Sequence, residues 1–235
     1  MVVGPLSSSS SMARRWTTRD IDLHTLADLM RTDRLRDRAW RGPKVIAFLA
    51  ANPVGTHALR LGDEWAEIAR ELKLAPYRDD FRFESRWAVT IDDLIRHLNE
   101  LDPTIIHLSA HGGSGTLILQ DEAGGPEPVS PDALAAIVGS AARNPRVALL
   151  NGCSTIAHAD ALCATVDVVV SMRGEISDAG ARMFASRFYG ALGNRRTVGN
   201  AVRQGRAKLL AKRLPDEALP DYVTREGIDA DLLIV

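Results

Sequence analysis

The sequence predicts an α/β fold in which helices flank both faces of a mostly parallel central sheet of about six strands. Short apolar runs that stop abruptly at polar or glycine-bearing turns alternate with segments whose apolar residues recur at helical spacing. Such bounded runs are typical of strands buried on both faces, and their alternation with helices favours parallel pairing. A hydrophobic fraction of 46% and a charged fraction of 25% are ordinary values for a globular protein.

The break at Gly42-Pro43 is the best boundary between two regions of different composition. Residues 1–11 contain a run of five serines and are expected to be disordered. Residues 12–41 are rich in charge, with apolar residues that can share one helical stripe. We therefore expect residues 1–43 to form a disordered segment plus a short helical extension, and residues 44–235 to form the main domain.

The first half of the main domain predicts strands and helices in alternation. Residues 45–50 are an apolar run, and residues 59–74 carry apolar residues at helical spacing. Residues 77–83 are more polar, which favours a strand near an edge of the sheet. Thr90 precedes two aspartates and predicts the N-cap of a helix that reaches Leu101. A buried strand then leads to His111, and residues 116–120 predict a small β-excursion.

The second half repeats the alternation. Ser130-Pro131 predicts a helix to about residue 142, because proline suits the first helical position. The apolar run 147–150 predicts the strand that leads to Cys153. The remaining expected elements, in chain order, are a short helix at 157–163, a strand at 166–171, helices at 176–192 and 197–214, and a last strand at 232–235.

A histidine and a cysteine each lie just past a buried strand. His111 is followed by Gly112, and Cys153 is preceded by Gly152. In an open parallel sheet, ligands and chemistry collect beyond the carboxyl ends of the strands. A thiol beside an imidazole base is the usual arrangement of a cysteine nucleophile. His111 and Cys153 are therefore the candidate catalytic pair.

These strand ends resemble the CHAT-domain branch of the caspase-like (caspase–separase) cysteine peptidases. The segments that carry the resemblance are residues 44–53 (KVIAFLAANP), 106–112 (IHLSAHG), 149–154 (LLNGCS), 169–178 (VVSMRGEISD) and 184–189 (FASRFY). The resemblance covers residues 44–235 and implies a caspase-like sandwich with endopeptidase activity on protein substrates. It implies that Cys153 is the nucleophile, that His111 is the general base, and that the backbone N–H groups of Gly112 and Cys153 stabilise the oxyanion.

The resemblance also places the pocket for the first substrate residue. By position Asn151 faces this pocket, and the loop after the fifth strand supplies further candidates. Glu175 and Asp178, or Arg173, can bring charge of either sign, whereas Met172 can form an apolar wall. The sequence leaves open which kind of substrate residue is preferred.

The other histidines and Cys163 are given structural roles. His107 is expected to be buried and hydrogen-bonded, His158 to lie on a helix surface, and Cys163 to belong to the core. Two cysteines are too few for a disulfide framework, so a reducing cytoplasm is expected. No histidines or cysteines have zinc-ligand spacing, and we expect neither a metal ion nor another cofactor.

Two alternatives come from other functional classes. One is a catalytically silent caspase-like scaffold for protein interaction. The other is a phosphate- or nucleotide-binding module built on residues 112–115, which is disfavoured because this loop leads into a β-excursion and not into a helix. A net charge of −1 gives no reason to expect nucleic acid or membrane as a partner.

Control is expected to come from a regulatory or activating protein partner, or from the segment 12–42. Residues 154–165, between Cys153 and the next strand, suggest a packed helix. Because such a segment is a poor site for proteolysis, we expect the chain to act uncut.

Overall fold

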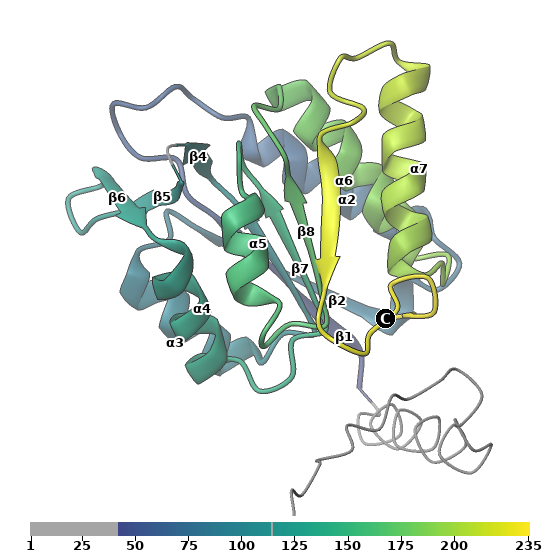
Figure 1. Ribbon diagram of the computed structural model, residues 1–235, viewed down its shortest axis with the longest axis horizontal. Coiled ribbons are helices and arrows are strands. Elements are labelled where there is room, and N and C mark those ends of the chain that lie inside the picture. Colours follow the sequence, from purple (N-terminus) through teal and green to yellow (C-terminus); the bar gives the residue numbers. More distant parts are fainter. Residues whose placement is uncertain (1–41, 114) are drawn as a thin grey trace, which may run out of the picture. The chain divides into compact units, whose positions relative to one another are not determined.

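The computed structural model describes residues 42–113 and 115–235, and the predictions for residues 1–41 lie outside this part of the chain. The residues from Pro43 onward form one compact unit around a six-stranded sheet (Figure 1). In spatial order the strands are β2 (Phe81–Trp87), β1 (Lys44–Ala50), β3 (Ile105–Ser109), β7 (Val147–Asn151), β8 (Val168–Met172) and β9 (Pro220–Thr224). All neighbours pair in parallel except β8 and β9. The predicted fold class is confirmed.

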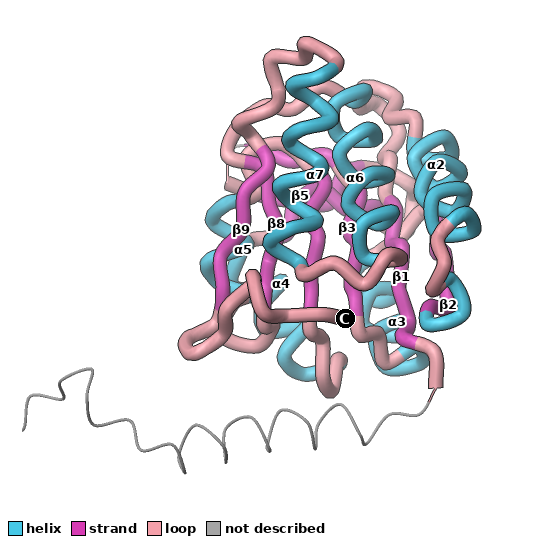
Figure 2. The backbone as a smooth tube through the Cα atoms, turned by 90° about the vertical axis from the view of Figure 1, so that its right-hand side faces the viewer, coloured by secondary structure: helices cyan, strands magenta, loops and turns pink. Residues whose placement is uncertain are grey.

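Helices cover both faces of this sheet, as Figures 1 and 2 show. One layer consists of α2 (Leu61–Leu74), α6 (Asp178–Leu192) and α7 (Val198–Ala211). The other consists of α3 (Ile91–Leu101), α4 (Pro131–Ala141) and α5 (Ile156–Leu162). No helix in the described part of the chain is long and apolar enough to cross a bilayer.

The strands separate two cores because successive side chains point to opposite faces. In β1, Ile46 and Phe48 belong to the core under α2 and α6, whereas Ala47 and Leu49 belong to the core under α3 and α4. All four side chains are fully buried. The same alternation directs the odd-numbered residues of β3 and β7 toward α2 and α6, which positions the polar residues discussed below.

A second, three-stranded antiparallel sheet follows β3. It consists of β4 (His111–Gly113), β5 (Thr116–Gln120) and β6 (Pro126–Val129). The buried side chains Leu117, Leu119 and Val129 attach it to the core under α3 and α4. The predicted β-excursion is confirmed, so residues 112 and 113 belong to a strand rather than to the start of a helix.

The predicted helix starts are also confirmed. Thr90 and Asp93 form a capping box at the start of α3, and Ser130 caps α4, where Pro131 is the first residue. These side chains accept hydrogen bonds from backbone N–H groups that have no partner within the helix.

The last predicted strand is wrong. Residues 232–235 form no strand, and the sheet ends instead with β9, which runs antiparallel to β8. Leu233 and Val235 are nevertheless buried, while Leu232 and Ile234 are exposed. The Leu233 carbonyl accepts a hydrogen bond of 2.9 Å from the N–H of Val198, the first residue of α7. The apolar tail therefore packs against the core and caps a helix without pairing in the sheet.

Candidate active site

A pocket lies at the carboxyl ends of β3 and β7, and it contains both His111 and Cys153. Its lining residues come from the ends of these strands, from the start of α2, and from the start of α6 and the segment before it. They are Leu59, Leu61, Glu64, Ser109, Ala110, His111, Asn151, Gly152, Cys153, Ile176, Asp178 and Ala181. Two of the predicted substrate-binding residues, Asn151 and Asp178, also line it. The topology thus collects residues that are far apart in the sequence at one edge of the sheet.

The two strand ends meet backbone to backbone. A Cβ atom on Gly112 would lie 2.1 Å from the carbonyl oxygen of Cys153, and one on Gly152 would lie 2.5 Å from that of Ala110. Real Cβ atoms do not approach other atoms so closely, so only glycine permits this packing. These glycines bring the backbones of residues 112 and 153 into direct contact.

The ring of His111 is held by the segment before α2. Its Nε2 lies 2.7 Å from the carbonyl oxygen of His57, which is 54 residues away in the sequence. A carbonyl oxygen only accepts hydrogen bonds, so Nε2 carries the hydrogen. In the neutral ring Nδ1 is then the basic nitrogen. His111 is half-buried, which leaves its ring accessible from the pocket.

Cys153 is a free, half-buried thiol. Its Sγ lies 3.7 Å from the carbonyl oxygen of Ile176, and the described residues show no hydrogen bond between Sγ and the His111 ring. Ser154, the next residue, has a left-handed backbone with φ of 52°. The turn is fastened to the end of β8, because the N–H groups of Ser154 and Thr155 donate to the carbonyls of Gly174 and Met172, both at 3.0 Å.

A buried carboxylate lies beneath the same strand ends. Glu64 of α2 is only 3% exposed. The Ser109 hydroxyl donates to its Oε2 at 2.5 Å, and the Asn151 amide nitrogen donates to its Oε1. Ser109 and Asn151 are register partners on β3 and β7, so both point toward α2. Two neighbouring strand ends therefore hold one carboxylate from the facing helix.

His107 connects this carboxylate to the core, and it is fully buried and hydrogen-bonded, as predicted. Its Nδ1 lies 3.1 Å from the Tyr189 hydroxyl, and its Nε2 lies 3.0 Å from Glu64 Oε1, at an angle that does not satisfy a hydrogen bond. Burial, with a smaller contribution from the negative charge of Glu64, raises the pKa of Tyr189 well above its ordinary value. Tyr189 therefore stays a neutral phenol that can donate to His107.

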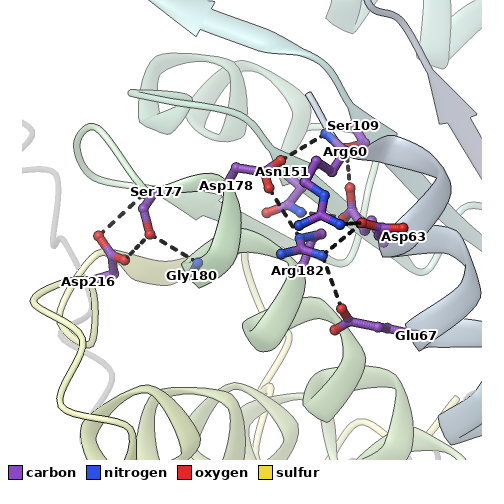
Figure 3. Close-up of polar contacts among 11 residues, drawn as sticks. Arg60, Asp63, Glu67, Ser109, Asn151, Ser177, Asp178, Gly180, Arg182 and Asp216 are labelled. Atoms are coloured by element: carbon purple, nitrogen blue, oxygen red, sulfur yellow. Dashed lines mark hydrogen bonds and ion pairs between the residues drawn. The ribbon is translucent and has the colours of Figure 1, made fainter. Parts of the chain in front are cut away.

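Ion pairs connect α2 and α6 beside the pocket, and of the residues that form them only Asp178 lines it (Figure 3). Arg182 lies within 3.3 Å of carboxylate oxygens of Asp63, Glu67 and Asp178. Asp178 also accepts a hydrogen bond from the backbone N–H of Arg60 at 3.1 Å. These contacts tie the start of α6 to α2 and to the residue before it.

A second set of hydrogen bonds holds the start of α6. The Ser177 hydroxyl donates to Asp216 at 2.5 Å and accepts from the N–H of Gly180 at 3.0 Å. Figure 3 shows this trio beside the ion pairs. A Cβ on Gly180 would lie 2.3 Å from an Asp216 oxygen, so glycine is needed for the close approach.

The other predicted pocket residues lie elsewhere. Met172 is fully buried in the core, and the apolar wall comes instead from Leu59, Leu61, Ile176 and Ala181. Glu175 is exposed outside the lining. Arg173 pairs with Asp221 of β9.

Two further interpretations change. His158 is not on a helix surface: it is fully buried, with Nε2 3.0 Å from the carbonyl oxygen of Val129. Cys163, expected in the core, is half-buried and packs against the core edge. Glu64 went unpredicted, although its spacing from Leu61, Ile68 and Leu72 puts a charged residue on the buried stripe of α2. Trp65, the next residue, is 37% exposed, although it is one of the apolar residues at helical spacing in residues 59–74.

A family model and a relative match this chain in sequence. The model of the CHAT domain family matches residues 5–222. A Roc-COR-CHAT protease from an unknown prokaryotic organism is 28% identical over 182 residues, which cover 74% of this chain and 17% of that protein. This chain therefore spans only a small part of the length of that relative.

Solved structures share the fold. Gingipain R, an Arg-specific cysteine proteinase, matches with a TM-score of 0.56 at 14% identity, over 82% of this chain and 47% of the gingipain chain. Caspase-1 from Spodoptera frugiperda matches with a TM-score of 0.51 at 10% identity, over 78% of this chain and 86% of the caspase chain. At such low identity the likeness shows the fold alone, and it confirms the caspase-like architecture.

Proposed function

The chain belongs to the CHAT domain family, and from this premise we propose that it is a cysteine endopeptidase in which Cys153 is the nucleophile and His111 the general base. The observation that carries the proposal is the pocket at the ends of β3 and β7, which both residues line. The hydrogen bond from His111 Nε2 to the His57 carbonyl supports it further, because it leaves Nδ1 as the basic nitrogen.

In the proposed reaction, His111 Nδ1 takes the proton of the Cys153 thiol as Sγ attacks the carbonyl carbon of the scissile peptide bond. The tetrahedral intermediate collapses when the C–N bond breaks and His111 gives this proton to the leaving amine. A water molecule, deprotonated by His111, then hydrolyses the thioester and releases the acid product and the free thiol. The bonds broken and formed balance without a cofactor.

We propose the backbone N–H groups of Gly112 and Cys153 as the donors that stabilise the oxyanion. The direct contact between these two stretches of backbone supports this assignment, because a Cβ on Gly112 would lie 3.1 Å from the Cys153 nitrogen. Loss of one such donor typically lowers kcat by about 10²–10³-fold.

The test is cleavage of a proteome-derived peptide mixture by the purified full chain, with new termini read by mass spectrometry. Cys153→Ala and His111→Ala are each expected to abolish cleavage and to leave the far-UV circular dichroism spectrum unchanged. Cys163→Ala is the matched control, because Cys163 lies outside the pocket, and it is expected to retain full activity. An active Cys153→Ala variant beside an inactive Cys163→Ala variant would show that the nucleophile is misassigned. A wild-type chain that cuts nothing, and whose Cys153 resists thiol-directed peptide inhibitors, would favour the silent scaffold.

We further propose that the enzyme works as one uncut chain in the cytoplasm and is activated by a protein partner or by residues 12–42. The helix α5 (Ile156–Leu162) supports the first point, because it fills the connection between Cys153 and β8 and buries His158, Ala159 and Leu162. The name of the Roc-COR-CHAT relative, of which this chain matches 17%, supports control by other protein parts. The measurement is the intact mass of the chain while activity appears. Activity that rises only in step with a cut between residues 153 and 168 would contradict the proposal.

A further inference from the structure

One residue of the pocket lining carries a hydrogen-bond acceptor that has no partner in the described part of the chain. Asn151 is only 4% exposed, and its Oδ1 forms no hydrogen bond with any of the residues 42–113 and 115–235. The amide is oriented by its other end, because its nitrogen donates to the Glu64 carboxylate, which only accepts. A buried carbonyl oxygen without a donor is costly and rare in folded proteins. Because Asn151 lines the pocket, a bound ligand can supply the missing donor.

The charge around this acceptor is negative. Glu64 and Asp178 line the pocket, and none of its lining residues is a lysine or an arginine. Asp63 and Glu67 add two more carboxylates on α2. These form ion pairs with the guanidinium groups of Arg60 and Arg182. Four carboxylates and two guanidiniums give a local net charge of −2.

Neither arginine lines this pocket. Arg182 is surrounded by the carboxylates of Asp63, Glu67 and Asp178, and only 15% of its side chain is exposed. Arg60 pairs with Asp63 at 2.6 Å, and it lines a neighbouring groove rather than this pocket. An acidic substrate residue would therefore meet like charge, which disfavours binding.

The walls suit an aliphatic chain. Leu59, Leu61, Ile176 and Ala181 contribute apolar side chains to the pocket lining. Lysine and arginine side chains pack their methylene groups on such surface while the charged head reaches polar partners. A purely aliphatic residue would fit the walls, but it would leave Asn151 Oδ1 without a donor.

We propose that this pocket selects a basic residue, lysine or arginine, immediately before the scissile bond. Asn151 Oδ1 accepts a hydrogen bond from the cationic head, and Glu64 supplies the compensating negative charge from directly beneath. This inference rests on the proposed peptidase function, since it assigns a substrate class to the same site. Glu64 and Asn151 are then specificity-determining residues, contributed by a helix and a strand end that lie 87 residues apart in the sequence.

Two measurements on the full chain separate the inference from the proposed function. In the peptide-mixture assay, cuts that disappear in Cys153→Ala are expected to follow lysine or arginine at least about tenfold more often than leucine, methionine or aspartate. In equilibrium titrations, acetylated tripeptide amides ending in lysine or arginine are expected to bind at least about tenfold more tightly than the norleucine peptide, which matches lysine without its charge. Cysteine-dependent cuts after other residues, or equal binding of lysine and norleucine peptides, would overturn the inference alone. Absence of any Cys153-dependent cut would overturn the peptidase function, while the titration would still decide what the pocket binds.

Charge variants test the assigned residues. Glu64→Gln keeps the size of the side chain but removes its charge, and it is expected to lower the lysine-to-norleucine preference about tenfold or more. Glu67→Gln is the matched control, one turn away in α2. Glu67 pairs with Arg182 but lies outside the pocket lining, so the lysine-to-norleucine preference of this variant should be unchanged. The double variant Glu64→Gln/Asn151→Asp moves the carboxylate to the strand end, where the glutamine amide can donate to it, and is expected to restore the preference. An unchanged preference in a folded Glu64→Gln variant would refute the role of Glu64.

Discussion

Gly112→Ala tests whether the contact between the two strand ends holds the site together. The added Cβ would lie 2.1 Å from the carbonyl oxygen of Cys153, about 0.9 Å short of the 3.0 Å that real Cβ atoms keep. The obstacle is backbone and not a flexible side chain, so β4 or the Cys153 turn must move by about 1 Å. A displacement of this size in an active site can cost about 10²-fold in rate.

The assay compares kcat/KM on a peptide that is cut in a Cys153-dependent manner with the free energy of unfolding in urea. Gly112→Ala is expected to lower kcat/KM about 10²-fold and the free energy of unfolding by about 1–3 kcal/mol, as overpacked sites do. Gly113→Ala is the matched control in the same strand, because its Cβ would meet no atom within 4 Å. Equal losses in the two variants, or full activity in Gly112→Ala, would refute the packing argument.

Two further predictions concern stability. Thr155→Val is expected to lower the free energy of unfolding by about 1–3 kcal/mol, because the Thr155 hydroxyl accepts a hydrogen bond from the N–H of Met172 at 3.0 Å and both groups are buried. Thr165→Val is the control: its half-buried hydroxyl only donates to a carbonyl, so the loss of stability should be smaller. Equal losses in the two variants would contradict this reasoning. Burial lowers the pKa of His158 below its ordinary 6.5, an effect opposed by the hydrogen bond to Val129. Because the unfolded chain then binds more protons, the free energy of unfolding should fall as the pH drops below about 6.5, by up to about 1.4 kcal/mol per pH unit. Urea unfolding between pH 8 and pH 5 should show a shallower fall for His158→Gln, and parallel curves would contradict the assignment.

The central strands and their ends could be predicted because they depend on local sequence. Residues 45–50 and 147–150 are apolar on both faces, so they had to be buried strands, and parallel pairing brings their carboxyl ends to one edge. Placing His111 and Cys153 at this edge needed only the strand assignments and the glycines beside them. Their catalytic roles remain predictions that the proposed variants test.

The elements that the sequence does not predict depend on distant partners. The true last strand, β9 (Pro220–Thr224), begins with proline and aspartate, and it is a strand because β8 offers an unpaired edge. The tail at 232–235 has stronger strand propensity, but it buries Leu233 and Val235 and hydrogen-bonds to the first residue of α7 instead of joining the sheet. His158 is buried because β6 supplies a carbonyl 29 residues away. No local pattern contains these partners.

Glu64 and Asn151 show why the substrate preference is hard to predict from single positions. An acidic residue at position 151 would be the simplest way to give this pocket a negative charge, and the asparagine there suggests its absence. Yet the amide nitrogen of Asn151 donates to Glu64, so the charge is present one layer deeper, on α2. A carboxylate at both positions would place two negative charges in contact in a buried site, which is strongly unfavourable. The carboxylate of Glu64 is therefore compatible with an amide at position 151 but not with a second carboxylate there. A single Asn151→Asp substitution is then expected to destabilise the fold rather than to strengthen the preference for a basic residue.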